Sequence, residues 1–372
     1  MKYLLAIDSF KGCLSSPEVE ETLASALQEK GAEVILLPLS DGGEGMLEAF
    51  TAVMGGRIVP TVVRDPLGRP ISAAYGIAPD GTAIIETAKA CGLTLMTAAE
   101  RNPLKASTYG VGELIVHALR NGSQQFIIGL GGSGTSDAGW GMLEALAEQL
   151  AADGTVGTDP GGCPEEMTIR TLQQLGDSAL KDCTFTLACD VRNPLCGPNG
   201  AAYTFGRQKG ANEAMLPLLD ERAFRRAELA ATRMGYDRSH LPGAGAAGGL
   251  GYAFLQFLDA ETRSGADLLL DLNGFDAWAA KADVVITGEG RSDRQTLMGK
   301  LPERVLRRAQ RYGTPVWLMA GRVEQPALLV AAGFARVDSI TPEGMPTNEA
   351  ILPEVARRNI RRYATLVGTA PD

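Results

Sequence analysis

The sequence predicts an α/β protein in which an open parallel sheet is interrupted by an inserted domain of mixed α/β structure. Buried strands alternate with helices at both ends of the 372-residue chain, as they do in parallel sheets. From Ile58 onward, alternating strands joined by turn residues indicate antiparallel pairing. Near the middle of the chain, a glycine-rich loop follows a buried strand. We assign residues 1–64 and 281–372 to the interrupted domain and residues 65–280 to the insertion.

The composition excludes several classes of protein. Hydrophobic residues make up 45% and charged residues 21% of the chain, as in folded soluble proteins. The net charge of −9 argues against a nucleic-acid partner and against an anionic membrane. No apolar run has the length of a signal peptide or a membrane span. The six cysteines are scattered, so we expect reduced thiols and a cytoplasmic location rather than disulfides or a zinc site.

The N-terminal residues predict a strand and then a helix. Residues 3–7 are apolar and end at a polar stretch that contains Asp8, Ser9 and Lys11. Ser16 is a favoured helix N-cap, and Pro17 fits the first helical turn. Residues 34–37 predict the next strand.

A second polar, glycine-bearing stretch follows that strand and contains Asp41 and Glu44. Ligands of open parallel sheets bind beyond the carboxyl ends of the strands. We therefore expect Asp8, Lys11, Asp41 and Glu44 to line one crevice. The alternative is that both stretches are ordinary solvated turns.

The inserted domain begins with strands predicted at residues 61–64, 71–77 and 82–86. The stretches between them, residues 65–68 and 79–81, are rich in Pro, Gly and Asp, which favour tight turns. This pattern predicts antiparallel pairing.

The glycine-rich loop is the most distinctive stretch of the insertion. Residues 126–130 are apolar, as in a strand buried on both faces, and a helix is expected from Trp140. Gly131, Gly132 and Ser133 lie between the two. Glycine lets the backbone approach a ligand, and a helix N-terminus offers free N–H groups and partial positive charge. We expect this loop to bind an anion such as phosphate. A tight turn without a ligand is the alternative.

Common nucleotide-binding motifs are incomplete or absent. The spacing Gly129-x-Gly131-x-x-Gly134 resembles a dinucleotide fingerprint, but no acidic residue follows a second strand at the required distance. The sequence contains no P-loop motif and neither the His-Arg-Asp nor the Asp-Phe-Gly motif of protein kinases.

Further loops of the insertion carry polar, basic or small residues. A strand at residues 185–188 leads into a loop rich in Pro, Gly and Asn, and a small-residue loop at 242–251 enters a helix. That second loop either approaches a ligand or permits close helix packing. The candidate binding residues of these loops are Asp190, Arg192, Asn193, Arg207, Lys209 and Gly245.

The end of the chain returns to alternating strands and helices. Strands are expected at residues 283–287 and 316–320, and helices at 302–312, 328–332 and 348–365. The loop after the first of these strands contains Glu289, Arg291 and Asp293. We infer that this segment completes the N-terminal sheet and that the site lies in a cleft between the domains.

The loops together supply carboxylates, cations and glycine-based anion sites. Phosphoryl transfer needs metal-binding carboxylates, cations that neutralise the moving group, and a base for the accepting hydroxyl. Only two histidines are present, so a carboxylate must be the base. We choose Asp190, with Asp293 second, because Asp293 is equally suited to bind Mg²⁺. Lys11, Lys209 and Arg291 are expected to hold the substrate carboxylate or phosphates.

The same stretches carry a family resemblance. The chain resembles the bacterial glycerate kinases of the two-domain type from end to end. The markers are residues 8–12, 38–45, 131–137, 189–200, 208–210, 242–249 and 287–293. The resemblance implies a flavodoxin-like domain interrupted by a mixed α/β domain similar to restriction endonucleases.

The resemblance also implies the reaction. ATP and Mg²⁺ would be the cosubstrates, D-glycerate the acceptor and a glycerate phosphate the product. Members of this group are associated with 2-phosphoglycerate, in the breakdown of glyoxylate, glucarate or galactarate, and the sequence leaves both the 2- and the 3-hydroxyl group open as the acceptor. From the loop carboxylates themselves, we choose Asp41, Glu44 and Asp293 as candidate metal ligands. A homodimer is the assembly to test for. Two other functions remain open: a nucleotide-cofactor oxidoreductase acting on a hydroxy acid, and a non-catalytic sensor of sugar acids.

Overall fold

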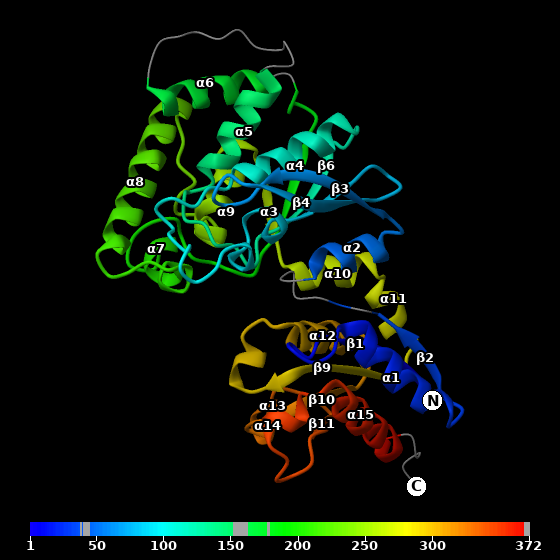
Figure 1. The fold of residues 1–372 in the computed structure, drawn as a ribbon. Coiled ribbons are helices and arrows are strands. Elements are labelled where there is room, and N and C mark those ends of the chain that lie inside the picture. The colour runs from blue at the N-terminus through cyan, green and yellow to red at the C-terminus, as the bar shows by residue number, and fades with distance from the viewer. Residues whose placement is uncertain (38, 40–44, 152–162, 177–178, 368–372) are drawn as a thin grey trace. The chain divides into compact units, whose positions relative to one another are not determined.

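Figure 1 shows a computed structural model of the chain that describes residues 1–37, 39, 45–151, 163–176 and 179–367. The chain folds into two compact units. Unit 1 contains residues 1–41 and 266–372, and unit 2 contains residues 42–265. Each unit has its own sheet and its own hydrophobic core.

Unit 1 is built on a five-stranded parallel sheet in the order β11-β10-β9-β1-β2. The strands are β1 (Lys2–Ile7), β2 (Glu33–Leu36), β9 (Val284–Ser292), β10 (Val316–Val323) and β11 (Arg336–Ser339). Counted along this unit, the spatial order is 2-1-3-4-5, which is the flavodoxin-like order. The predicted flavodoxin-like sheet is therefore confirmed.

Helices cover both faces of this sheet (Figure 1). They are α1 (Ser16–Gln28), α10 (Gly265–Leu272), α11 (Phe275–Ala279), α12 (Leu301–Gln310), α13 (Pro326–Ala331), α14 (Thr347–Ala350) and α15 (Pro353–Val367), with the short 3₁₀ turn η5 (Arg294–Leu297). Leu5 and Ile7 of β1 share one apolar cluster with Leu23 of α1 and Ile360 of α15. Because side chains alternate along a strand, this cluster buries one face of β1.

Several details of unit 1 differ from the sequence-based expectation. The cap of α1 is Ser15, in a capping box with Glu18, because Ser16 instead donates its hydroxyl to the Ile7 carbonyl at 2.6 Å. Strand β9 continues five residues beyond the expected Thr287, to Ser292, so Glu289 and Arg291 lie on a strand. The helix expected over residues 348–365 is divided into α14 and α15, the second beginning at Pro353.

Unit 2 contains a six-stranded mixed sheet in the order β3-β4-β5-β6-β7-β8. The strands are β3 (Arg57–Arg64), β4 (Pro70–Ile77), β5 (Ala83–Glu86), β6 (Gln125–Gly129), β7 (Thr184–Ala188) and β8 (Glu261–Arg263). The first three pair antiparallel, as the turn residues predicted, and β5 to β8 pair parallel. Mixed α/β structure is thus confirmed for this unit.

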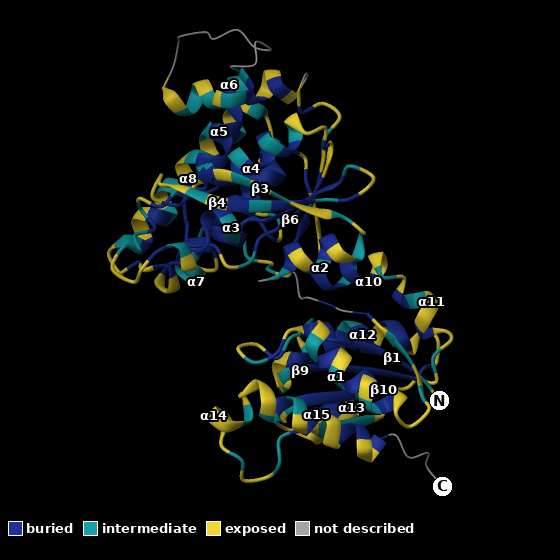
Figure 2. Cartoon of the chain, turned by 45° about the vertical axis from the view of Figure 1, so that its right-hand side comes forward, coloured by how far each residue is buried: buried dark blue, intermediate teal, exposed yellow. Residues whose placement is uncertain are grey.

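The helices of unit 2 surround a core centred on β6. They are α2 (Met46–Val53), α3 (Ala88–Cys91), α4 (Tyr109–Arg120), α5 (Trp140–Leu150), α6 (Pro164–Gly176), α7 (Ala201–Phe205), α8 (Met215–Met234) and α9 (Leu250–Phe257), with the 3₁₀ turns η1 (Leu93–Leu95), η3 (Arg207–Lys209) and η4 (Ala246–Gly249). Phe126 of β6 stacks on Phe185 of β7 with ring centroids 4.7 Å apart. Figure 2 shows the central strands buried.

The unit boundaries differ from the expected ones at 64/65 and 280/281. Strand β3 pairs along its whole length with β4, so residues 57–64 belong to the sheet of unit 2. Helices α10 and α11 belong to unit 1, because Asp267 pairs with Arg304 and Asp276 with Arg308 of α12. The two compact units divide at 41/42 and 265/266.

All six cysteines are free thiols, as expected from their scattered spacing. Among the described residues, no helix combines the length and apolar character needed to cross a membrane.

Candidate active site

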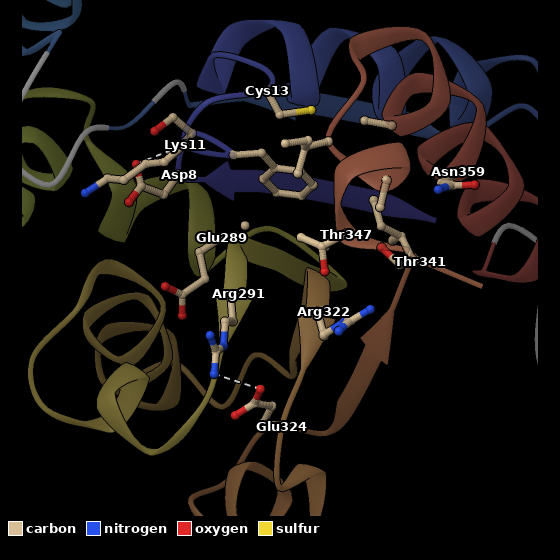
Figure 3. Close-up of a pocket in the computed structure, with 18 of the residues that line it drawn as sticks. Asp8, Lys11, Cys13, Glu289, Arg291, Arg322, Glu324, Thr341, Thr347 and Asn359 are labelled. Atoms are coloured by element: carbon tan, nitrogen blue, oxygen red, sulfur yellow. Dashed lines mark hydrogen bonds and ion pairs between the residues drawn. The ribbon is translucent and has the colours of Figure 1, made fainter. Parts of the chain in front are cut away.

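A cavity of about 450 Å³ lies at the carboxyl ends of β1 and β9 in unit 1 (Figure 3). The strand that follows β1 in the chain, β2, lies on one side of β1, whereas β9, β10 and β11 follow one another on its other side. The direction in which successive strands are added to the sheet therefore reverses between β1 and β9. Ligands of open α/β sheets bind at such a reversal. The charged side chains of the lining are Asp8, Lys11, Glu289, Arg291, Lys300, Arg322 and Glu324. The structure therefore brings together the predicted residues Asp8, Ser9, Lys11, Glu289 and Arg291.

Asp8 follows β1 directly and is held firmly in place. Its backbone N–H donates to the Gly288 carbonyl at 2.9 Å, and its Oδ1 accepts from the Ser9 N–H at 2.7 Å. Ile7, the residue before Asp8, donates its backbone N–H to the fully buried carboxylate of Glu20 at 2.9 Å. Burial raises the pKa of Glu20 well above its usual range. These contacts position a carboxylate that is only 8% exposed at the edge of the cavity.

The carboxylate of Glu289 is hydrogen-bonded to residues close to it in the sequence. Its carboxylate accepts hydrogen bonds from Thr296 at 2.6 Å, Ser292 at 3.1 Å and Lys300 at 3.2 Å. Glu289 thus positions Lys300, whose ammonium also lines the cavity. Nearby, the exposed Arg291 pairs with Glu324 at 2.8 Å.

Asp293 has a structural contact that the sequence did not reveal. Its Oδ1 accepts from the Gln295 N–H at 2.7 Å, which caps η5, and Asp293 lies outside the described lining of the cavity. This position gives less support to Asp293 as a base or metal ligand than to Asp8. Asp41 and Glu44, the other predicted metal ligands, lie outside the described residues.

The described residues contain no cluster of three or more His, Cys, Asp or Glu side chains that could hold a metal ion. A nucleotide-bound Mg²⁺ does not need one, because in kinases one or two carboxylates and the substrate phosphates complete its coordination. Asp8, a well-placed carboxylate beside Lys11 in the cavity lining, fits that smaller requirement.

In unit 2, the glycine-rich loop joins β6 to α5. Asp137 is 7% exposed and accepts hydrogen bonds from the N–H groups of Thr108 at 2.8 Å and Gly141 at 3.1 Å. It therefore ties the starts of α4 and α5 together. Several glycines of the loop are packed tightly: a Cβ added at Gly134 would lie 2.5 Å from Met96 Cε.

The small-residue loop at 242–251 also serves packing. A Cβ at Gly245 would lie 2.3 Å from the Pro194 carbonyl oxygen, and one at Gly248 would lie 2.0 Å from the Thr135 carbonyl oxygen. We expected Gly245 to contact a ligand, but the residue is buried and packs against the backbone of Pro194. Of the two interpretations of this loop, close packing is the one that the geometry supports.

Gly131 and Gly132 form the accessible part of the glycine-rich loop. Gly132 is exposed and has φ +71°, a conformation that favours glycine, and an added Cβ would meet only Ala88 Cβ, at 3.1 Å. Any anion bound by this loop would therefore meet the backbone at these two residues.

We expect Gly132→Val to weaken binding of ADP or glycerate by about tenfold, because a branched side chain would fill the backbone approach. Gly122→Val is the matched control, since Gly122 has φ +89° and open space around its Cβ position at the other end of β6. Calorimetric titration should separate the two variants, although both lose stability. Equal binding by both would assign Gly132 to packing alone.

Lys209 lies beneath this loop. Its side chain is only 2% exposed, and its Nζ donates to Ser133 Oγ at 2.9 Å and to the Thr135 carbonyl at 2.7 Å. Burial lowers the pKa of Lys209 from 10.5 to about 8. We expected Lys209 to grip a phosphate directly, but its position makes it a support for Ser133.

The lowered pKa predicts a pH-dependent stability. Between pH 8 and 10.5 the unfolded chain keeps the proton of Lys209 while the folded chain loses it. Through this lysine the unfolded state then binds more protons, so its contribution to the free energy of unfolding should rise with pH, by on the order of 3 kcal/mol across the window. Burial raises the pKa of Cys183 and Cys189 from 9.0 to about 11, which lowers the total free energy of unfolding above pH 9, so the effect of Lys209 is measured as the difference between parent and variant. In urea unfolding, the free energy of the parent minus that of Lys209→Met should rise over this window, whereas the difference between the parent and the exposed control Lys105→Met should stay constant. The same slope in all three proteins would contradict the assignment.

Asp190 is exposed just beyond the carboxyl end of β7, beside the exposed Arg192. The next residue, Asn193, braces the loop by donating to the Asn199 carbonyl at 2.7 Å and accepting on its own carbonyl from the Gly245 N–H at 2.9 Å. Because β6 and β7 are parallel neighbours, Asp190 and the glycine-rich loop lie at the same edge of the sheet. Arg207 instead pairs with Glu213 at 2.7 Å.

Several residues of the cavity in unit 1 were missed from the sequence. Arg322 and Glu324 lie at the end of β10, which we expected to stop at Ala320. Asp8 was identified because it is a polar residue just after an apolar strand. Arg322 and Glu324 also follow an apolar run, so the same criterion identifies them. Asn359 lies within α15, where no local signal distinguishes it.

Comparisons with known proteins agree with one another. A model described as "Glycerate kinase family" matches residues 3–370. The chain is 41% identical to a glycerate kinase of Bacillus subtilis (strain 168), covering 100% of this chain and 98% of the relative. It is 42% identical to a glycerate 2-kinase of Escherichia coli (strain K12), covering 86% of this chain and 85% of the relative.

A crystal structure described as a "putative glycerate kinase 2" from Salmonella typhimurium LT2 has a TM-score of 0.81 and 38% sequence identity, covering 99% of this chain and 97% of that one. The resemblance read from the sequence is confirmed, and with it the activity class of a kinase. The chain belongs to the glycerate kinase family.

Proposed function

We propose that this kinase transfers the terminal phosphoryl group of ATP to the 2-hydroxyl group of D-glycerate, giving 2-phosphoglycerate. Membership of the family supports glycerate as the acceptor. The 2-hydroxyl is supported by the E. coli relative, which is named a glycerate 2-kinase. Breakdown of glyoxylate, glucarate or galactarate is the metabolic setting that we propose for this product.

The observation that carries the proposal is the charged end of the cavity at the reversal of the sheet. Lys11, Arg291 and Lys300 line it together with the carboxylates of Asp8, Glu289 and Glu324. Lys300 is paired with Glu289, and Arg291 with Glu324. Phosphoryl transfer is catalysed mainly by positioning and by neutralising the moving group. Cations for the phosphates beside a carboxylate for Mg²⁺ suit that requirement.

Asp8 is the carboxylate that we assign to Mg²⁺ in this cavity, together with the phosphates of the nucleotide. Mg²⁺ supplies neutralisation of phosphate charge when bound. The contacts of Asp8 to Gly288 and Ser9 hold its carboxylate at the carboxyl end of β1. We assign the general base to Asp190, which has an exposed carboxylate at the edge of the sheet in unit 2.

A coupled assay for ADP release over a panel of hydroxy acids tests this function. We expect Mg²⁺-dependent turnover with D-glycerate, lost on chelation and restored by Mg²⁺. Phosphorus NMR of the product should show the phosphate on the 2-oxygen. Reduction of NAD(P)⁺ without ADP release would instead indicate an oxidoreductase. Thermal stabilisation by glycerate without turnover would indicate a sensor.

A homodimer stays a prediction, which sedimentation of the full chain tests.

A further inference from the structure

We propose that the uncharged end of the cavity in unit 1, formed by α14, α15 and the residues after β11, holds the base of the nucleotide. The inference rests on the proposed kinase function and goes beyond it by assigning the nucleotide to unit 1. The evidence is the distribution of charge along the cavity, its size, and one buried amide.

The two ends of the cavity differ in charge. Asp8, Lys11 and Arg291 come from the carboxyl ends of β1 and β9. Thr341, Thr347 and Asn359 line the opposite side (Figure 3). Arg322 lies near Thr347, and its guanidinium donates to the Met345 carbonyl at 3.3 Å. A ligand that matches this cavity has an anionic end and a neutral end.

Glycerate does not match the whole cavity. It is a small molecule whose carboxylate and hydroxyl groups cover nearly all of its surface, and it would leave much of a cavity of about 450 Å³ unfilled. The walls include the apolar side chains of Phe10, Ile340 and Ile351. Burying polar groups against such walls without hydrogen bonds costs free energy, whereas burying a flat base there releases it. A nucleotide has both the polyphosphate and the base that the two ends require.

Asn359 supplies a polar group suited to the edge of a base. Its side chain is only 4% exposed and lines the cavity. Within the described chain, its side-chain partner is Met345 Sδ, 3.8 Å from Nδ2, which is a weak acceptor. A carboxamide both donates and accepts, so it can pair with adjacent donor and acceptor atoms of a purine, as asparagine does with adenine in nucleic acids.

Ile351→Asp provides the test, because Ile351 lines the cavity yet is 46% exposed, so folding should tolerate the change. A carboxylate at this position would replace the apolar contact with the base by a charged group and would repel the phosphates. We expect the Kd of ADP, measured by calorimetry on the full chain, to rise by about tenfold or more. The KM for D-glycerate should stay within about twofold.

Leu352→Asp is the matched control. Leu352 is the next residue, is 52% exposed and is not part of the described lining, so the same charge is added outside the cavity. It should leave the Kd of ADP within about twofold. Asn359→Leu, which keeps the volume of the side chain, should narrow the difference in Kd between ADP and CDP.

The outcomes separate this inference from the proposed function. A raised KM for glycerate with unchanged ADP binding would place the acceptor in the cavity and overturn the inference. Equal effects of Ile351→Asp and Leu352→Asp would overturn it as well. If the chain fails to phosphorylate glycerate while Ile351→Asp still weakens ADP binding, the proposed function fails and the base site is supported.

Discussion

Asp190→Asn is expected to lower the turnover number by roughly 10²–10⁴-fold while leaving the KM values for ATP and glycerate nearly unchanged. The amide keeps the shape of the side chain but cannot take the proton of the accepting hydroxyl. The chain contains only two histidines, His117 and His240. Nδ1 of His117, on α4, lies 3.0 Å from the hydroxyl of Tyr75, and His240 is outside the described lining of the cavity, so we assign the role to a carboxylate. The measurement is steady-state kinetics with both substrates varied.

The same strand provides a control for Asp190. Asp182 is exposed just before the amino end of β7, whereas Asp190 is exposed just after its carboxyl end. Asp182→Asn therefore removes the same charge from the other end of the strand and should leave turnover unchanged. If Asp190→Asn is fully active and Asp293→Asn is inactive, the base is Asp293, despite its contact with the cap of η5.

The central strands of both sheets could be predicted from the sequence because burial on both faces leaves a continuous apolar run. The residues at the ends of β1 and β9 followed from the same reasoning, since a polar residue after such a run lies at the edge of the sheet. Of the four edge strands, β2 and β3 were predicted in part, at residues 34–37 and 61–64, whereas β8 and β11 gave no such signal. β8 is fully exposed, and β11 pairs only with β10, so neither needs an apolar sequence.

Side-chain environments that depend on distant residues were not predictable. Lys209 belongs to a basic loop in the sequence, but its ammonium is buried by Ser133 and Thr135, more than 70 residues earlier in the chain. β3 has the alternating pattern of any half-buried strand, and only its pairing with β4 shows which sheet it joins. Local pattern therefore identified the elements, while long-range contacts decided the unit boundary and the burial of this lysine.

Lys11→Met is expected to lower kcat/KM for ATP by at least about tenfold, the effect of losing one charge-assisted hydrogen bond to a phosphate. Phe10 and Leu14 are buried and paired, with the Phe10 N–H donating to the Leu14 carbonyl at 2.8 Å, so they anchor the turn that carries Lys11. Lys11 itself is exposed and lines the cavity. The substitution should therefore leave the melting temperature unchanged.

The salt dependence of the same variant tests whether charge is the cause. In a chain of net charge −9, a local cation attracts an anionic substrate against the surrounding field, and added salt screens that attraction. The kcat/KM of the parent should fall more steeply with ionic strength than that of Lys11→Met. Lys281→Met, which removes an exposed lysine outside the described lining of the cavity, should behave as the parent does. Full activity of Lys11→Met with an unchanged salt dependence would show that this ammonium makes no contact with the phosphates, and the charged end of the cavity would then depend on Arg291 and Lys300.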